Sequence, residues 1–178
     1  LTRWKGQAVV SEALARLGRR DLLALLGGDD QGRNPYRDEL IALIDRLGLG
    51  GTVRLTDHCT DMPAAYMLAD VVVSASTLPE AFGRVAAEAQ AMGRPVIATA
   101  HGGAEETVLA GETGWLVPPG DAAALAAALE QALALASDGP GRLAVAAAAR
   151  AHVFERGFTL SDMCARTFEV YAELLESR

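Results

Sequence analysis

Residues 79–88 place two carboxylates around an expected helix start. Glu80 lies in a loop after the apolar run 71–73, and Glu88 follows eight positions later in an alanine-rich segment. Eight helical residues rise roughly 12 Å at most, a span that a hexose and a ribose joined by a diphosphate can bridge. Each carboxylate can accept sugar hydroxyls, and the free N–H groups of residues 82–84 between them favour an anion. The stretch is therefore a candidate site for a phosphorylated sugar.

Two glutamates alone also have an ordinary explanation. Such a pair more often consists of an acidic residue at a helix start and a solvent-exposed glutamate on the helix than of two ligand contacts. Lys5 adds a second indication, because it precedes an expected helix over residues 6–17. A cation there opposes the helix dipole unless an anion binds alongside, so Lys5 is a candidate phosphate contact, with a solvated lysine as the alternative.

Apolar strand-like runs alternate with amphipathic helical segments along the whole chain. The runs are continuous, which indicates strands covered on both faces, and they lie at 21–28, 52–56, 71–74, 96–99 and 115–117. We expect helices at 6–17, 35–47, 62–68, 82–92, 104–110, 121–136, 142–156 and 159–175. Asp121 should cap the long helix that reaches residue 136, and residues 137–141 should separate that helix from the next one. This order predicts a doubly wound, Rossmann-like parallel α/β sheet. Ligands of such sheets bind at the carboxyl ends of the strands, where the loops 28–32, 57–61, 74–80 and 99–103 follow.

Composition narrows the class of protein. The chain of 178 residues carries a net charge of −7 and no basic stripe, which argues against a nucleic-acid partner and against broad contact with anionic lipid. Cys59 and Cys164 have no metal-ligand spacing, and we expect two free, buried thiols in a reducing compartment. We expect Trp115 to be a packing residue. The length of the chain predicts a single domain over residues 1–178. Leu1 is not a natural start, so we expect this domain to belong to a longer protein.

Several blocks resemble the C-terminal domain of the retaining GT-B glycosyltransferases known as group 1 or family 4. Glu80 and Glu88 form the E-x7-E pair of that family, and the resemblance covers almost the whole chain. The blocks appear in the family's order at 3–6 (RWKG), 53–76, 79–88, 93–98 (GRPVIA), 102–108 (GGAEETV) and 111–121 (GETGWLVPPGD).

The resemblance implies roles for the residues of the central motif. Glu80 would hold hydroxyls of the donor sugar, and the backbone of Ala81, Phe82 and Gly83 would face the sugar and the distal phosphate. Glu88 would accept hydrogen bonds from the ribose of the nucleotide.

Other matched positions would hold the phosphates. Lys5 would bind the diphosphate and stabilise the leaving group, and Gly102 and Gly103 would let the backbone approach the donor. Glu106 matches the family's acid after that loop. Arg84 is a candidate phosphate contact, with solvated surface as an equal alternative.

Two departures from the family pattern stand out. The arginine that the family pairs with Lys5 would precede Leu1. Arg3 is a candidate partial substitute for it, with an exposed turn residue as the simpler explanation. Asp57 stands where the nucleobase loop usually has glycine, which leaves the base open. His58 in that loop is a candidate base contact, with an exposed loop histidine as the simpler explanation.

The resemblance implies the donor-binding half of a cytoplasmic glycosyltransferase that transfers a sugar from a nucleotide-diphosphate sugar with retention. Its partners would be the donor and the enzyme's own N-terminal domain, against which the terminal helix 159–178 would pack. The oligomeric state stays open. Contact with a membrane would come only through sequence outside this chain. We expect no cofactor and no metal. The alternatives are a noncatalytic α/β binding module that kept the fold and, with less support from the motif blocks, a nucleotide-sugar epimerase of similar architecture.

Overall fold

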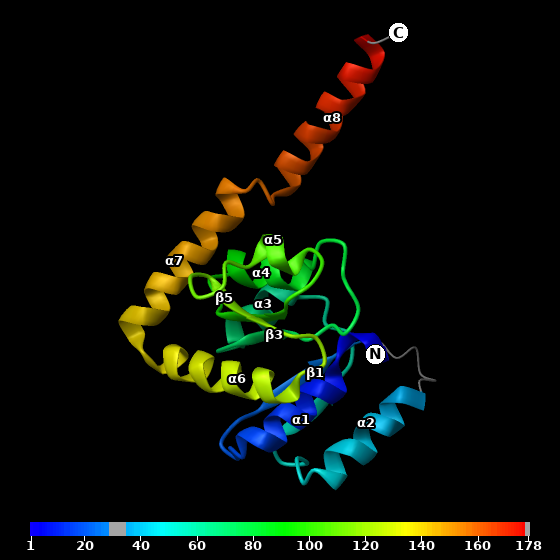
Figure 1. Ribbon diagram of the computed structural model, residues 1–178, viewed down its shortest axis with the longest axis vertical. Coiled ribbons are helices and arrows are strands. Elements are labelled where there is room, and N and C mark those ends of the chain that lie inside the picture. Colours follow the sequence, from blue (N-terminus) through cyan, green and yellow to red (C-terminus); the bar gives the residue numbers. More distant parts are fainter. Residues whose placement is uncertain (29–34, 177–178) are drawn as a thin grey trace.

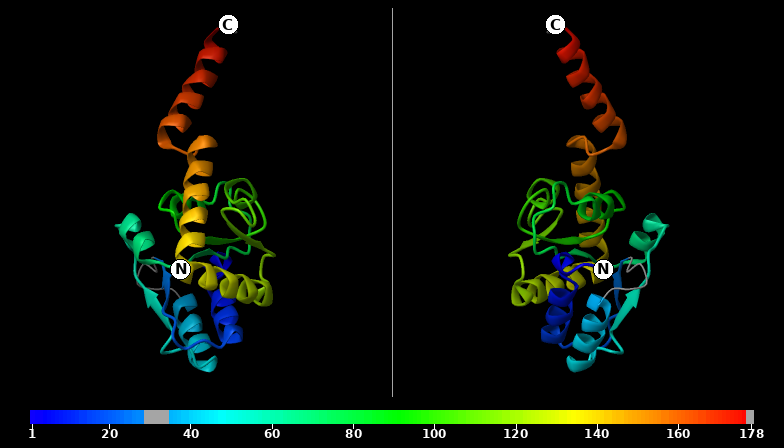
Figure 2. Two further views of the ribbon diagram at one scale, coloured as in Figure 1. Left: turned by 90° about the vertical axis from the view of Figure 1, so that its left-hand side faces the viewer. Right: turned by 90° about the vertical axis from the view of Figure 1, so that its right-hand side faces the viewer.

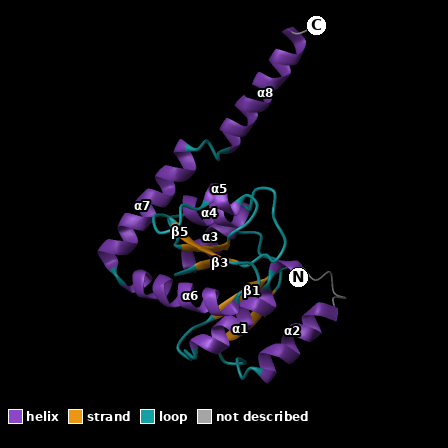
Figure 3. Cartoon of the chain, viewed as in Figure 1, coloured by secondary structure: helices purple, strands orange, loops and turns teal. Residues whose placement is uncertain are grey.

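Short parallel strands form two small sheets in the computed structural model, which describes residues 1–28 and 35–176 (Figures 1 and 3). Strands β1 (Ala24–Gly27) and β2 (Val53–Thr56) pair in one sheet. Strands β3 (Val72–Ser74), β4 (Val96–Thr99) and β5 (Gly114–Val117) pair in that order in the other. The helices are η1 (Arg3–Lys5, a 3-10 turn), α1 (Gln7–Leu17), α2 (Pro35–Arg46), α3 (Met62–Leu68), α4 (Arg84–Ala91), α5 (Ala104–Thr107), α6 (Ala122–Ser137), α7 (Gly139–Glu155) and α8 (Leu160–Glu176).

The expected parallel α/β class is confirmed, but one continuous hydrogen-bonded sheet is not formed by the described residues. No ladder joins β1 to β3 among them. The start of the chain lies beside both sheets, since Leu1 is against Gly28 after β1 and the Trp4 carbonyl accepts from Thr77 N–H, at 2.6 Å, after β3. The segments that follow β1 and β3 therefore both contact the start of the chain.

Burial agrees with the prediction for the central strand and not for the first one. Every residue of β4 is buried, as expected for a strand covered on both faces. The prediction that 21–28 is a buried strand is wrong for one face, because Leu23 and Leu25 are 56% and 61% exposed. The regular strand is also shorter, since β1 begins only at Ala24. The predicted loop over 29–32 lies outside the described residues.

Helix α6 joins the halves of the core. Its alanine and leucine face packs on α1 and on the second sheet, and it contributes Leu125, Leu129 and Ala132 to the main hydrophobic cluster. The predicted cap at Asp121 is confirmed, because its carboxylate accepts from Ala123 N–H and Ala124 N–H at 2.9 Å. Trp115 packs against this cluster as predicted and donates to Gln131 Oε1 at 2.9 Å.

Two helix boundaries differ more than the others from the sequence expectation. Helix α5 ends at Thr107 rather than at residue 110, because Val108 adopts an extended backbone conformation. Helix α7 begins at Gly139, so the spacer predicted over 137–141 shrinks to Asp138, which flanks both α6 and α7. Pro140 fits there because it stands in the first turn, where a backbone N–H is not needed.

Helix α8 projects away from the rest of the domain (Figures 1 and 2). None of its residues is buried. Its exposed apolar side chains are Leu160, Met163, Phe168, Val170, Tyr171, Leu174 and Leu175. That this helix packs against another domain stays a prediction. Both cysteines are exposed, Cys164 on this helix and Cys59 after β2, so the expectation of buried thiols is wrong.

Candidate functional site

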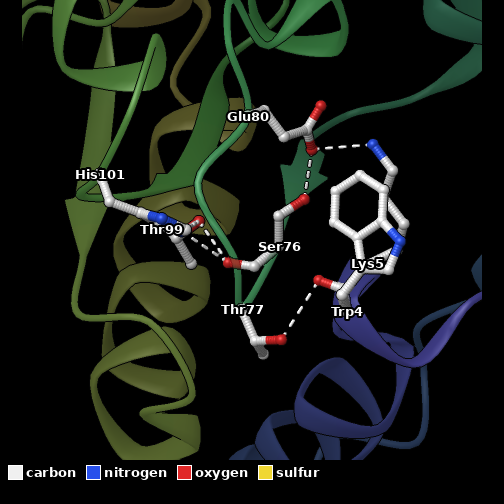
Figure 4. A network of polar contacts seen from close by, with 7 residues as sticks. All are labelled: Trp4, Lys5, Ser76, Thr77, Glu80, Thr99 and His101. Carbon is white, nitrogen blue, oxygen red and sulfur yellow. Dashed lines mark hydrogen bonds and ion pairs between the residues drawn. The ribbon is translucent and has the colours of Figure 1, made fainter.

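The carboxylate of Glu80 is held at one oxygen by two side chains. Lys5 Nζ lies 2.8 Å from Glu80 Oε1, and the Ser76 hydroxyl donates to the same oxygen (Figure 4). Within residues 1–28 and 35–176, Oε2 of Glu80 has no partner and remains available to accept hydrogen bonds from a ligand. The fold thus brings together Lys5 and Glu80, two predicted site residues that lie far apart in the sequence.

Glu80 is ionised at neutral pH. Burial by itself would raise the pKa of its carboxyl, but hydrogen bonds from Lys5 and Ser76, with the positive charge of Lys5, hold that pKa below its usual value of 4.5. Because the pKa of Glu80 is lowered by folding, its ionised carboxylate stabilises the fold at a pH above the usual pKa of 4.5. That contribution is lost as the pH falls through the native pKa.

Glu80→Gln is therefore expected to lower the melting temperature near neutral pH and to lose this effect progressively as the pH falls below 4.5, the usual pKa of the carboxyl. Thermal unfolding of both proteins across this pH range measures the difference. The control is Glu39→Gln, which breaks an ion pair with Arg3 whose side chains are 53% and 66% exposed; it should change little at any pH. A difference between wild type and Glu80→Gln that grows with acidity would contradict the assignment.

The backbone places Lys5 at this position. Lys5 ends η1, and Gly6 then adopts a left-handed conformation (φ 74°) before α1 begins. The ammonium also lies 4.3 Å from the centre of the Trp4 ring, a cation–π contact that helps to fix it. The lysine therefore points toward the loop after β3 rather than into solvent.

A second network lies next to Glu80 and was not predicted. His101 Nε2 is 2.8 Å from the Ser76 carbonyl and 2.9 Å from Thr99 Oγ1, and Thr99 Oγ1 donates to the same carbonyl (Figure 4). Because a carbonyl only accepts, Nε2 must carry a proton. Each of these two residues follows a strand of the predicted edge, and Ser76 is also the last residue of the matched block 53–76, but neither was predicted as a site residue. Together they help line a small pocket formed by Ser74, Ser76, Glu80, Gly83, Ala86, Thr99, His101 and Ala104.

The two glycines after His101 allow two backbone segments to touch. Gly103 N–H donates to the Glu80 carbonyl at 2.9 Å. A Cβ on Gly102 would lie 2.4 Å from that carbonyl oxygen, and one on Gly103 would lie 2.4 Å from the carbonyl oxygen of Phe82. The glycines are thus needed where their loop meets residues 80–82. Their predicted approach to a donor stays a prediction.

Helix α4 begins at the rim of the pocket. Gly83 caps it in a left-handed conformation (φ 75°), and Arg84 is its exposed first residue. The first amides of a helix have no acceptor within the helix, so they face an approaching anion. Phe82, before the cap, makes an edge contact with Phe158 between α7 and α8, with ring centres 5.3 Å apart.

Glu88 lies one turn after Arg84 on α4 and is exposed. One of its oxygens, Oε2, accepts a hydrogen bond from the Tyr66 hydroxyl at 2.9 Å. It does not line the Glu80 pocket, which agrees with a separate contact further along the helix. Tyr66 was not predicted as a site residue, and its sequence context shows only an apolar helical position.

The loop after β2 contributes the least to the assembled site. His58 is exposed, and its side chain forms no hydrogen bond or ion pair within the described part of the chain. Asp57 pairs with Arg37 of α2 at 3.7 Å, but its side chain is 89% exposed. A nucleobase contact for His58 therefore stays a prediction. Among the described residues, no cluster of three or more potential ligands could hold a metal ion, and no helix has the length and apolar character needed to cross a membrane.

A lysine–carboxylate pair and a helix N-terminus at the carboxyl edge of parallel strands are typical of an α/β domain that binds a phosphorylated ligand. Comparison with known proteins refines this class. The profile described as "Glycosyl transferases group 1" matches residues 1–151, and the chain belongs to this family.

Relatives and solved structures agree with the family assignment. The chain is 36% identical to D-inositol 3-phosphate glycosyltransferase 1 from Catenulispora acidiphila over 184 residues, which cover 98% of this chain and 42% of the relative. A glycosyltransferase from Rickettsia africae superposes with a TM-score of 0.93 and 35% identity over 99% of this chain and 46% of that one. HepE from Anabaena, solved in complex with UDP-glucose, gives a TM-score of 0.87 and 34% identity over 97% of this chain and 46% of its own.

These matches confirm the resemblance seen in the sequence. The chain spans less than half the length of each of these proteins. It corresponds to the C-terminal part of these longer GT-B glycosyltransferases. Its fold is accordingly that of their C-terminal domains.

Proposed function

We propose that residues 1–178 bind the nucleotide-diphosphate sugar donor of a glycosyltransferase. The observation that carries this proposal is the Glu80 carboxylate, held at Oε1 by Lys5 and Ser76 with Oε2 open beside the start of α4. An open carboxylate oxygen accepts sugar hydroxyls, whereas an ammonium and free helix amides attract phosphate. The two chemistries lie side by side, as they do in the proposed donor.

The proposal gives each group one partner. Glu80 Oε2 accepts from a hydroxyl of the donor sugar, and the amides at Gly83 and Arg84 face the distal phosphate. Lys5 meets the diphosphate, for which it exchanges part of its contact with Glu80. Glu88 accepts from the ribose.

Sugar transfer breaks the bond between the anomeric carbon and the diphosphate oxygen and forms a bond from that carbon to an acceptor oxygen, whose proton leaves with the departing diphosphate. Negative charge develops on the departing diphosphate, and Lys5 with the α4 amides stabilises it electrostatically. We propose that this stabilisation needs no metal and that the reaction retains the anomeric configuration. The acceptor would bind the remainder of the longer, cytoplasmic protein, whose N-terminal domain would also cover α8.

We propose uridine as the base of the donor. The support comes from HepE, a relative at 34% identity whose solved complexes contain UDP and UDP-glucose. Asp57 and His58 stand where the resemblance places the base contacts, so they are the residues on which the choice of base depends.

Calorimetric titration of the folded chain with UDP, ADP, GDP and the corresponding sugar nucleotides tests the proposal. We expect saturable binding with a preference for the uridine compounds, and weaker binding of uridine monophosphate because it lacks the distal phosphate. The folded state is checked by circular dichroism before titration. Absence of binding by every nucleotide would contradict a donor site on this chain, whereas equal binding of all three bases would contradict the uridine assignment alone.

A further inference from the structure

Tyr66 is a buried residue with its polar end at the donor side of α4. Its ring is 5% exposed and packs in the second hydrophobic cluster with Val72, Ala86 and Ala89. Its hydroxyl leaves this cluster and meets Glu88 Oε2 at 2.9 Å. The rigid ring fixes the position of the hydroxyl, because a residue packed on several sides has little freedom to change its rotamer.

The direction of this hydrogen bond follows from the groups. An ionised carboxylate only accepts, so the phenol donates. Burial raises the pKa of Tyr66, and the hydrogen bond to Glu88 and the negative charge of that residue raise it further. The phenol therefore keeps its proton at any pH at which the protein works.

Glu88 would otherwise be a mobile side chain. It is exposed on α4, and the Tyr66 hydroxyl is the only partner of its carboxylate within residues 1–28 and 35–176. With Oε2 tethered, Oε1 is presented to solvent in one orientation. Glu80 shows the same arrangement, with Oε1 held by Lys5 and Ser76 and Oε2 open.

We propose that Tyr66 is a positioning residue that holds the Glu88 carboxylate in the orientation needed to accept the two ribose hydroxyls of the donor. The inference rests on the proposed donor site and adds a residue to it. Because a fixed carboxylate loses less side-chain entropy when the ribose binds, the hydroxyl of Tyr66 contributes to affinity without touching the ligand.

Tyr66→Phe removes the hydroxyl and keeps the ring in the core. Its affinity for UDP and for 2′,3′-dideoxy-UDP, measured by calorimetry, separates positioning from a general structural effect. We expect UDP to bind roughly three- to tenfold more weakly to the variant, within the range for the net contribution of one ordinary hydrogen bond, because the Tyr66 hydroxyl acts on the ligand only through Glu88. We expect 2′,3′-dideoxy-UDP, which lacks both hydroxyls, to bind wild type and variant equally. The matched control, Tyr171→Phe on exposed α8, should leave both affinities unchanged.

Glu88→Gln supplies the second arm. It should weaken UDP binding, and adding Tyr66→Phe to it should weaken binding no further, because the carboxylate to be positioned is gone. If Glu88→Gln weakens UDP binding and Tyr66→Phe does not, the role of Tyr66 is overturned while the donor site stands. An equal loss of both nucleotides in Tyr66→Phe also overturns it, since that is a structural effect. If UDP does not bind the wild-type chain, the donor site itself fails.

If Tyr66→Phe does not fold, Glu88→Asp carries the test. It keeps the charge and withdraws the carboxylate by one methylene from the Tyr66 hydroxyl. Positioning is supported if Glu88→Asp loses affinity for UDP but keeps its affinity for 2′,3′-dideoxy-UDP. The loss of UDP affinity should then be at least as large as in Glu88→Gln. A UDP affinity equal to that of wild type overturns it, because the tether would then be unnecessary.

Discussion

Lys5→Ala is expected to weaken UDP binding by about tenfold to a hundredfold, the range for losing a hydrogen bond between charged groups. The variant removes the ammonium that would meet the diphosphate. It also leaves the Glu80 carboxylate without its cation, 2.8 Å away in the wild type, and an unpaired carboxylate repels an approaching phosphate. Calorimetric titration with UDP and uridine monophosphate measures the effect, which should be much larger for the diphosphate.

The effect of Lys5 can be measured without interference from other lysines. Lys5 is the only lysine among 178 residues, whereas 15 of the 16 basic residues are arginines. An ammonium is a compact point charge, and the planar guanidinium of arginine does not reproduce its place over the Trp4 ring and beside Glu80. We therefore expect Lys5→Arg to restore only part of the affinity, and Arg3→Ala, two residues away on the surface, to have little effect.

Chemical modification provides an independent check of the same prediction. An amine-reactive reagent can modify only Lys5 and the terminal amine of this chain. UDP should slow the modification of Lys5 and leave that of the terminal amine unchanged, as followed by mass spectrometry of the peptides. Equal modification with and without saturating UDP would show that the ammonium does not meet the diphosphate.

Gly6→Ala is expected to lower the free energy of unfolding by about 3–4 kcal/mol, because backbone strain and a steric clash add at one residue. Gly6 has a φ of 74°, and a Cβ at this position would lie 1.9 Å from the carbonyl oxygen of Ala75. Relief requires α1 to move away from the loop after β3. That movement would carry Lys5 away from Glu80, so UDP binding should fall as well.

Gly120→Ala is a matched control for this variant. Gly120 has almost the same φ, 75°, but no atom lies within 4 Å of an added Cβ. In Gly120→Ala the free energy of unfolding should fall only by the strain of a left-handed alanine, about 1 kcal/mol, and UDP should bind normally. Denaturant unfolding of both variants gives the difference, which measures the clash. Equal losses of stability would show that Gly6 is not pressed against Ala75.

The sequence by itself determined the class of fold and the central motif at residues 79–88. Alternation of apolar runs with helical periods predicted parallel strands, and side-chain caps such as Asp121 marked helix starts correctly. Order and spacing of the motif blocks identified the family, and they singled out Lys5 and Glu80, which the structure brings into contact. These features are local or depend on spacing along the chain, so they can be read without coordinates.

Tertiary structure decided which side chains complete the site. No motif marks Ser76 or His101 as a site residue, and they join the site because β3 and β4 are neighbours in register. Tyr66 has the sequence context of a core residue, and only the packing of α3 beside α4 brings its hydroxyl to Glu88. The exposed face of β1 and the separation of the two sheets also escaped prediction. An apolar run specifies that a strand forms, whereas the elements that pack beside it determine which of its faces are covered.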